Sequence, residues 1–595
     1  MNELLPLIVA APLVGGALLV ALGRRLPRRA AETLGMVFAA VPAALAPALL
    51  AGSSATAGLS EWVGGWTPVH GHSVGIVLTG DHVGLGLAAL VSLLVLAVLA
   101  YSWRYFDEPP HRHSGSFPAL VLLFQAGMCG FAITGDLFNA FVFFELMSVV
   151  AYALTGYRVE EARAVQGAFT FGVVNSLGAY ATLTGIILLY ARTGELGMRA
   201  VGRALDRQGG PDGLVLAAFV LVLTGFLVKA AVVPFHFWLP DAHAVAPTPV
   251  CMLLSGVLVE LGVYGAWRVY WTVFAGPGGV PHPDAGRALI ILGTLSALVG
   301  AVMCWKQRHL KRMLAYSTVS HTGLFLIGVG VLTPAGASGV ALYVIGHAGT
   351  KAALFACVGI LLDRYGSVDE HELHGKGREL PVVGVLFAVG GLALAGAPPL
   401  GTALGKALTE GASGAWLTVV FVLTSAVTGG AVLRAAARVF GVSALTGRAA
   451  PPPGHQAYET SGEDEEPEST GTLTRVPVTM LAVPAVLLLG CLLTGSVPAV
   501  ARAVARSVDG ALPGGVTAPA VWSVPGVLLG LLSTGLAAGL AAYAVRRPHG
   551  SRSGGRDLTA PLRRLHSGHV GDYVAWMLVG MAVLGALALP GVISG

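Results

Sequence analysis

Apolar runs of about twenty residues, separated by short polar stretches, recur along the whole chain. A helix of this length crosses the roughly 30 Å hydrocarbon core of a lipid bilayer. Only 11% of the 595 residues are charged, whereas roughly a quarter are charged in a soluble domain. These features exclude a water-soluble enzyme and predict an all-α polytopic membrane protein.

Sixteen membrane crossings are predicted from these runs. Their approximate bounds are 4–22, 31–51, 82–101, 117–134, 136–157, 166–190, 214–233, 249–271, 287–305, 312–332, 339–362, 381–409, 415–437, 476–496, 522–545 and 571–592. The first lacks a basic leader and a cleavage site, so we expect it to be retained. Of the 36 Lys and Arg residues, 25 lie in loops that follow odd-numbered spans. Because basic loops stay in the cytoplasm, we expect both chain ends to lie outside. The net charge of +5 therefore reflects orientation, and no nucleic-acid partner is implied.

Residues 441–475 form a polar stretch between two of these spans. The stretch contains Pro451–Pro453 and the acidic run from Glu463 to Glu468, with almost nothing to bury. Such a composition favours a disordered, solvated cytoplasmic loop. Docking of a basic partner on the acidic run is the alternative.

At least five ionisable residues fall at mid-bilayer positions inside predicted spans, namely Glu145, Lys229, Glu260, Lys351 and Lys406. A charge at mid-bilayer costs roughly 3 kcal/mol on insertion scales, so these groups should face protein or water. If Glu145 and Lys229 face each other, each favours the charge of the other, and a proton transfer would alter both. This is the chemistry of a proton relay; a static ion pair that fixes helix register is the alternative.

Prolines interrupt two of the spans that carry these lysines. Pro234 follows Lys229 by five residues, and Pro398 and Pro399 precede Lys406. A proline inside a helix removes a backbone donor and breaks or kinks the helix. Paired broken helices at membrane depth are typical of ion sites in transporters.

His347 and Lys351 are four residues apart, so they share one face of their helix. Imidazole titrates near neutral pH, and burial moves the proton affinity of an amine toward the same range. The pair therefore suits a proton way-station. The alternative is a buried histidine that is merely hydrogen-bonded in the core.

No cofactor or metal site is predicted in this chain. The cysteines occur singly, without a C-x-x-C motif, at Cys129, Cys251, Cys304, Cys357 and Cys491. The loop pairs His70/His72 and His111/His113 lack a third ligand, and the stretch from Asp369 to His374 departs from H-E-x-x-H. Any redox chemistry is therefore expected in partner subunits.

Four segments resemble the antiporter-like subunits shared by respiratory complex I (NADH-quinone oxidoreductase), group 4 membrane-bound hydrogenases and Mrp-type Na⁺/H⁺ antiporters. They are Phe144–Ser148, Lys229–Val250, Leu310–His321 and His347–Gly359, and the resemblance covers roughly residues 80–440. It implies a core of fourteen helices built from two inverted five-helix repeats, with the seventh and twelfth helices discontinuous. It also implies a multi-pass protein of the bacterial cell membrane.

The resemblance further implies a proton path. In such a path Glu145 and Lys229 form the coupling pair, His347 and Lys351 continue the hydrophilic axis, and Lys406 connects to the outer side. Family members usually carry Lys or a polar substitute at the position of Glu260, so Glu reverses the charge there. One hypothesis is that Glu260 neutralises Lys229 or Lys351 and changes the ion preference.

Together these observations predict four regions: N-terminal helices with an external loop (1–80), a proton-translocating antiporter-like core (81–440), the disordered acidic cytoplasmic loop (441–475) and C-terminal transmembrane helices (476–595). The last two spans carry no intramembrane charge and are expected to serve docking or lipid-facing packing.

The leading function is a proton-translocating subunit of a hetero-oligomeric membrane complex, with or without exchange for Na⁺. The alternative is a membrane-arm subunit of a redox-driven NADH/ferredoxin-quinone oxidoreductase or hydrogenase, which leaves open whether the chain is part of an enzyme. A scaffold that has lost conduction is a third option.

Overall fold

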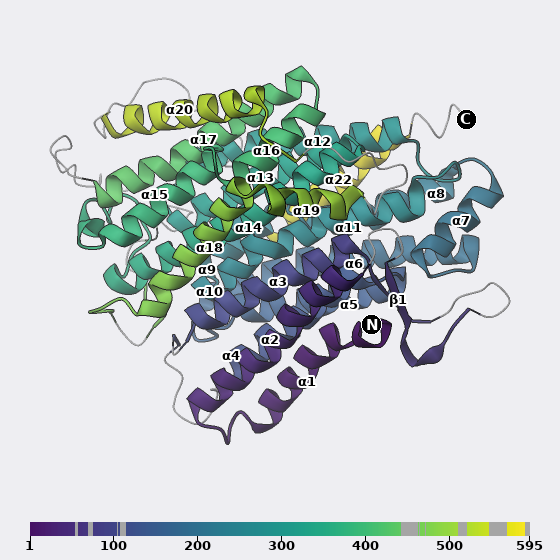
Figure 1. Cartoon of the computed structure of the whole chain (residues 1–595), viewed down its shortest axis with the longest axis horizontal. Coiled ribbons are helices and arrows are strands. Elements are labelled where there is room, and N and C mark those ends of the chain that lie inside the picture. The colour runs from purple at the N-terminus through teal and green to yellow at the C-terminus, as the bar shows by residue number, and fades with distance from the viewer. Residues whose placement is uncertain are drawn as a thin grey trace.

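Long apolar helices build the molecule, as the sequence predicts (Figure 1). The structure is a computed structural model and describes residues 1–53, 58–68, 75–103, 105–106, 115–441, 462, 465–469, 472–509, 520–546 and 568–589. Within these residues, 14 helices are long and apolar enough to cross a membrane. Two shorter apolar helices, Gly213–Lys229 and Pro381–Ala395, occupy two further predicted spans. The all-α polytopic fold is therefore confirmed.

The elements of the first half run in the following order: η1 (Asn2–Leu4), α1 (Leu7–Leu22), α2 (Arg28–Gly52), β1 (Leu59–Trp62), η2 (Val63–Gly65), β2 (Val77–Gly80), α3 (His82–Tyr101), α4 (Ser116–Ile133), α5 (Leu137–Thr155), α6 (Ala162–Thr193), α7 (Met198–Gln208), α8 (Gly213–Lys229), α9 (Trp238–Val245) and α10 (Thr248–Leu253). The two strands pair antiparallel, with Leu59 opposite Gly80. Aspartates cap several of these helices; Asp136, for example, accepts from the Asn139 N–H at the start of α5.

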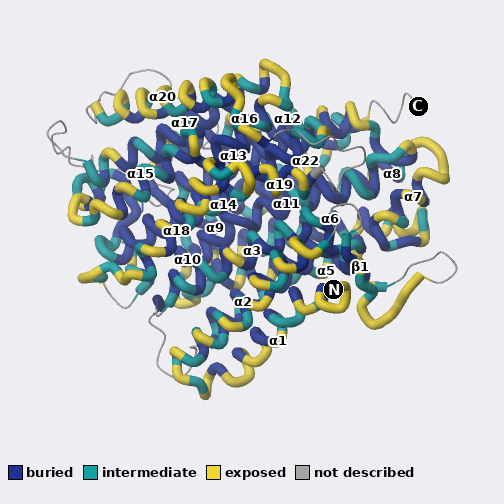
Figure 2. The backbone as a smooth tube through the Cα atoms, viewed as in Figure 1, coloured by how far each residue is buried: buried dark blue, intermediate teal, exposed yellow. Residues whose placement is uncertain are grey.

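The remaining elements are η3 (Leu254–Leu258), α11 (Val259–Val269), η4 (Tyr270–Phe274), α12 (His282–Lys306), α13 (Leu310–Gly330), α14 (Pro334–Tyr365), η5 (Lys376–Glu379), α15 (Pro381–Ala395), α16 (Gly401–Ala412), α17 (Ala415–Phe440), α18 (Val478–Ser496), α19 (Pro498–Asp509), α20 (Val524–Arg546) and α22 (Val570–Ala588). Elements η3 and η4 are π-helical turns on either side of α11. Such turns are frequent at functional sites. The most deeply buried spans are α13 and the segment from α10 to η4, and Figure 2 shows the buried interior around them.

The two predicted breaks are present. Helix α8 ends at Lys229 and α9 begins at Trp238, with a cis peptide bond before Pro234. Helix α15 ends at Ala395 and α16 begins at Gly401, with a cis bond between Pro398 and Pro399. Backbone groups freed by such breaks must find partners when no water reaches them.

Side chains from other helices supply these partners. At the first break the Ser296 hydroxyl accepts from the Val233 N–H at 2.9 Å, and the Trp238 indole donates to the Val228 carbonyl at 2.9 Å. At the second, hydroxyls of Thr402 and Ser533 donate to the Ala393 and Ala395 carbonyls, both at 2.7 Å. These hydrogen bonds stabilise the backbone at and beside both breaks.

The last two membrane helices, α20 and α22, each pack against one break. Figure 1 shows α20 alongside α17. Helix α20 lies along α17 and brings Ser533 to the second break. Helix α22 lies against α8, and the Tyr573 hydroxyl donates to Asp241 of α9 at 3.0 Å. Gly580 allows this approach, because a Cβ there would lie 2.4 Å from Phe235. The expectation of docking or lipid-facing packing rested on the absence of charge in these two spans, which gives no signal for their contacts with the breaks.

The acidic loop differs from expectation at Glu468. Its side chain is only 3% exposed and forms an ion pair with Lys311. The prediction of a solvated linker is therefore wrong for this residue, because the carboxylate finds a buried ammonium group. Lys311 itself, predicted in a loop, is the second residue of α13 and is buried. Pro451–Pro453, Glu463 and the histidine pairs His70/His72 and His111/His113 lie outside the described residues.

The stretch from Asp369 to His374, which departs from the zinc motif, holds its loop against α17 through ion pairs, and we call this arrangement the clasp. Glu370 is fully buried and binds Arg434 at 2.8 Å and Arg438 at 2.8 Å, both on α17. Asp369 pairs with Arg308 at 3.0 Å. Carboxylates that are held by guanidinium groups in this way fix the chain beside α17.

Replacing Glu370 by Ala should destabilise the protein by about 3–5 kcal/mol, because it leaves largely buried guanidinium groups without a counter-charge. The effect is measured as a loss of thermal stability of the purified protein in detergent. Glu372→Ala is the matched control, since its pair with Lys376 is exposed and contributes about 0–1 kcal/mol. Equal effects of the two substitutions would contradict the assignment of the clasp.

Candidate ion-translocation site

Lys229 ends α8 at the first break, and its ammonium group reaches α5. Its Nζ donates to the Ser148 hydroxyl at 2.5 Å and lies 4.5 Å from the centre of the Phe144 ring. Glu145 is half-buried on the same helix, and its Oε1 has no hydrogen-bond partner among the described residues. The charges of Glu145 and Lys229 act on each other. The direct contact of the lysine is therefore with Ser148, and Glu145 acts on it through its charge.

Glu260 and His347 form the central contact of the site. Glu260 Oε1 lies 2.8 Å from His347 Nδ1, and both side chains are buried. Glu260 Oε2 and His347 Nε2 have no partner within the described part of the chain. The hypothesis paired Glu260 with a lysine; the structure instead pairs it with the histidine, and only its charge acts on Lys351.

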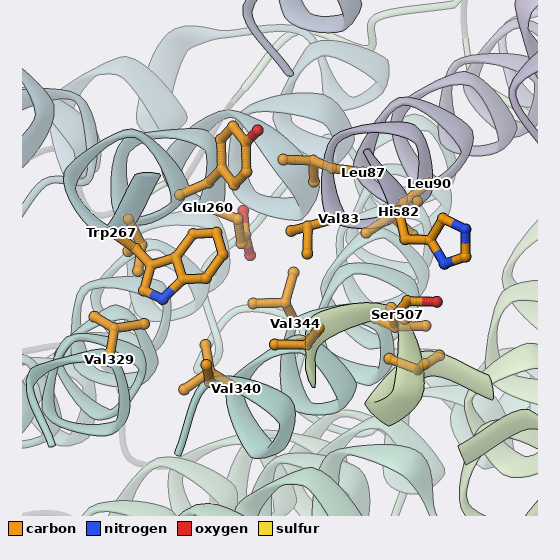
Figure 3. Close-up of a pocket in the computed structure, with 18 of the residues that line it drawn as sticks. His82, Val83, Leu87, Leu90, Glu260, Trp267, Val329, Val340, Val344 and Ser507 are labelled. Carbon is orange, nitrogen blue, oxygen red and sulfur yellow. The ribbon is translucent and has the colours of Figure 1, made fainter. Parts of the chain in front are cut away.

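An apolar cavity of about 220 Å³ lies beside this contact (Figure 3). Its walls come from α3, α11, α14 and α19, with Trp267, Val340 and Val344 among them. The Glu260 carboxylate faces this space in Figure 3. An apolar wall keeps the local dielectric low, so the charges of Glu260 and its neighbours interact strongly.

Lys351 lies one turn from His347 on α14 and binds α13. Its Nζ donates to the Leu314 carbonyl and to the Ser317 hydroxyl, each at 2.5 Å. These are neutral acceptors, so within the described residues the ammonium group has polar solvation without a direct counter-ion. Such a lysine can lose and regain a proton without breaking an ion pair.

His321 is a buried imidazole on which the charges of both lysines of the second half act. Its ring stacks on His347 with 5.3 Å between centroids, and its nitrogens contact the hydroxyls of Tyr343 at 2.8 Å and Thr428 at 3.1 Å. The charges of Lys351 and Lys406 both act on it. His321 ends the Leu310–His321 segment, but the sequence does not predict its contacts, because a histidine in the middle of an apolar span gives no pairing signal by itself.

Lys406 lies on α16, directly after the second break. Its Nζ is 3.4 Å from Glu410 Oε1 and donates to the Ser533 hydroxyl at 2.9 Å. Glu410 was missed because it falls just past the predicted span, although its spacing of four residues from Lys406 is a usable signal. Ser533 is separated from Lys406 by 127 residues, and no local pattern indicates that contact.

Replacing Ser533 by Ala should lower ion transport about threefold to tenfold, the effect of losing one buried hydrogen bond. Lys406 would lose an acceptor, and the Ala395 carbonyl at the break would lose its donor. The measurement is ion flux of the purified complex in proteoliposomes. Thr534→Ala is the control, since its hydroxyl binds only the Gly530 carbonyl of the same helix. Full activity of Ser533→Ala would show that α20 has no part in transport.

Comparison with known proteins gives a consistent set of matches. A family described as NADH:quinone oxidoreductase/Mrp antiporter, TM matches residues 134–431. NADH-quinone oxidoreductase subunit N of Desulforudis audaxviator is 33% identical over 402 residues, which are 66% of this chain and 78% of that protein. A Na(+)/H(+) antiporter subunit of Bacillus subtilis is 28% identical, over 77% of this chain and 90% of that protein. A chain of the Mrp complex from Dietzia sp. has the same fold, with a TM-score of 0.74 and 23% identity, covering 98% of this chain and 60% of that chain.

Proposed function

The chain belongs to the NADH:quinone oxidoreductase/Mrp antiporter transmembrane family, and on that premise we propose that it is a proton-translocating subunit of a larger membrane complex. The observation that carries the proposal is the set of buried ionisable side chains that runs from Lys229 at the end of α8 to Lys406 of α16. Charged groups inside a membrane protein mark ion pathways and proton relays. Static packing does not require so many of them.

The first half of the proposed path couples Glu145 to Lys229. Bringing a carboxylate toward an ammonium group from about 8 Å to about 4 Å changes their interaction by about 2 kcal/mol at an effective dielectric constant of 20. This exceeds the roughly 1.4 kcal/mol that corresponds to a tenfold change in proton affinity. A small shift of α5 relative to the end of α8 is therefore enough to load or unload Lys229.

The second half of the proposed path leads from Lys351 to Lys406. Ser317, the imidazoles of His347 and His321, and the hydroxyls of Tyr343 and Thr428 supply groups that donate and accept protons along the way. Lys406 lies beyond His321 at the second break, where the unwound backbone opens the helix. We propose that this end connects to the outer side.

Glu260 is proposed to control the charge of the central segment. Glu260→Gln keeps a hydrogen-bonding group beside His347 but removes the negative charge that acts on Lys351. We expect proton flux to fall about tenfold, the scale of a charge-assisted hydrogen bond. Fluxes of H⁺ and Na⁺ are measured in parallel, with Tyr264→Phe as a control on the same helix. Unchanged transport of both ions would rule out a role for Glu260.

A redox-driven membrane arm is the second candidate, and the relative named NADH-quinone oxidoreductase subunit N favours it. In that case the redox centres belong to partner subunits and this chain supplies the ion path. Purification of the native complex decides between the two, because small antiporter subunits or quinone-site and hydrogenase subunits would accompany the chain. Failure of the reconstituted native complex to move protons in either direction would contradict the proposed function.

A further inference from the structure

The segment Glu465–Ser469 of the α17–α18 loop carries a carboxylate from the surface into the protein. The side chain of Glu466 is 82% exposed, whereas that of Glu468, two residues later, is only 3% exposed. Burying a carboxylate is costly unless the charge is paired and hydrogen-bonded. The contacts of Glu468 therefore need an explanation beyond loop packing.

Three groups from different parts of the chain hold the Glu468 carboxylate. One oxygen pairs with the Lys311 ammonium group of α13. The other accepts from the Thr248 N–H at the start of α10 at 2.6 Å and from the Tyr105 hydroxyl at 2.8 Å. Burial alone would raise the pKa of Glu468, but Lys311 and these donors hold the pKa below its ordinary value. The group therefore stays ionised.

The loop backbone is held in place around this carboxylate. Asp363 of α14 accepts from the N–H groups of Glu468 at 2.7 Å and Ser469 at 3.1 Å. The Glu465 N–H donates to the Gly366 carbonyl at 2.9 Å. The segment is thus fixed across the ends of α10, α13 and α14 on the side where the basic loops gather.

Contacts of Lys311, the partner of Glu468, lead along α13 toward Lys351. Lys311 Nζ donates to the Ala246 carbonyl at 3.1 Å, between α9 and α10. One turn further along α13, Leu314 binds Lys351. His243 of α9 is buried, neither of its ring nitrogens has a partner among the described residues, and the charges of both lysines act on it. Lys311 and His243 therefore form the cytoplasmic end of the proposed path.

We propose that Glu468 is a positioning residue that keeps this cytoplasmic end closed: it holds Lys311 against the α9–α10 junction and must release it when the path exchanges protons with the cytoplasm. The inference rests on the proposed proton-translocating function. It gives the acidic loop a role as a latch on the first broken segment, where the sequence suggested only a linker.

The native thiol of Cys251 reports on this latch. Its Sγ donates to the Ala246 carbonyl at 3.4 Å, the same carbonyl that binds Lys311, and it is buried. In the complete complex, Glu468→Gln should increase the rate at which a water-soluble maleimide labels Cys251 about tenfold, the effect of losing a charge-assisted hydrogen bond. Glu466→Gln, in the same segment but exposed, should leave the rate unchanged. Equal labelling rates in Glu468→Gln and wild type overturn the proposal.

Measuring the proton leak distinguishes a residue that keeps the path closed, the latch, from one that only holds the loop in place, a structural clamp. The passive proton leak of proteoliposomes with Glu468→Gln should rise about tenfold. Adding Lys351→Ala should remove that leak, because the path that begins at Lys311 and His243 continues through Lys351. Exposure of Cys251 without any leak would mean a clamp only and overturns the proposal. A leak that persists with Lys351→Ala while Cys251 is exposed contradicts the proposed path through Lys351 and leaves the proposed role of Glu468 intact.

Labelling of the remote buried Cys129 would show that Glu468→Gln unfolds the chain. In that case a milder variant tests the proposal. Tyr105→Phe removes one donor to Glu468 and keeps its charge and its pair with Lys311. It should raise Cys251 labelling about threefold, within the range expected for one neutral hydrogen bond, with Cys129 still protected. No change in that variant overturns the proposal.

Discussion

The Lys229→Ala variant is expected to assemble normally and to lose proton translocation by about a hundredfold or more, the scale on which removing a proton-transfer group slows such a step. Lys229 is the only ammonium group within the described residues that contacts Ser148 beside Glu145. Alanine can neither carry the proton nor respond to the Glu145 charge. The measurement is the quenching of a pH-sensitive dye by the native complex in proteoliposomes.

Assembly of that variant should survive because the substitution removes a buried charge rather than creating one. Thr224→Ala is the matched control on α8, since its hydroxyl binds only the Val220 carbonyl and its loss should leave transport near that of wild type. Wild-type flux in Lys229→Ala, with the protein present in the complex, would count decisively against a relay through the first half.

Much of the fold could be predicted from the sequence because its strongest signals are local. Apolar runs of helical length define the spans, and prolines after Lys229 and before Lys406 place the breaks. Both signals depend on residues adjacent in the chain. The bilayer requires the same length of apolar helix from each segment, so each span can be predicted without knowing which helices pack beside it.

The pairings of the site could not be predicted in the same way. Glu260 binds a histidine 87 residues away, and Lys406 binds a serine 127 residues away. Which partner a buried charge selects depends on the rotation and depth of packed helices, and neither is encoded in spacing along one helix. Lys229 illustrates this, because it reaches α5 at Ser148, one turn beyond Glu145.

Glu468 shows where composition misleads. An acidic, proline-rich loop with little to bury is typical of a solvated linker, and one buried carboxylate hardly changes that composition. The signal that existed was a lysine, Lys311, close to the start of a span and without a sequence-local partner. Burying a lysine is costly unless its charge is paired or hydrogen-bonded, and here a distant loop provides a carboxylate.

Lys351→Ala should likewise reduce proton translocation about a hundredfold or more, since it removes a proton carrier. Lys351 occupies the middle of the proposed path, between His243 on the side of Glu468 and His321 on the side of Lys406. The substitution leaves Leu314 and Ser317 without their donor but creates no buried unpaired charge. The fold should therefore persist, and the path should be interrupted in its centre.

Proton flux through Lys351→Ala in proteoliposomes that contain the complete complex tests the connected path most directly. The predicted result is a flux no greater than that of liposomes without protein, while Lys229, Glu260 and Lys406 remain in place. A flux equal to that of the wild-type complex would mean that protons bypass the centre of the buried chain, and it would contradict the account.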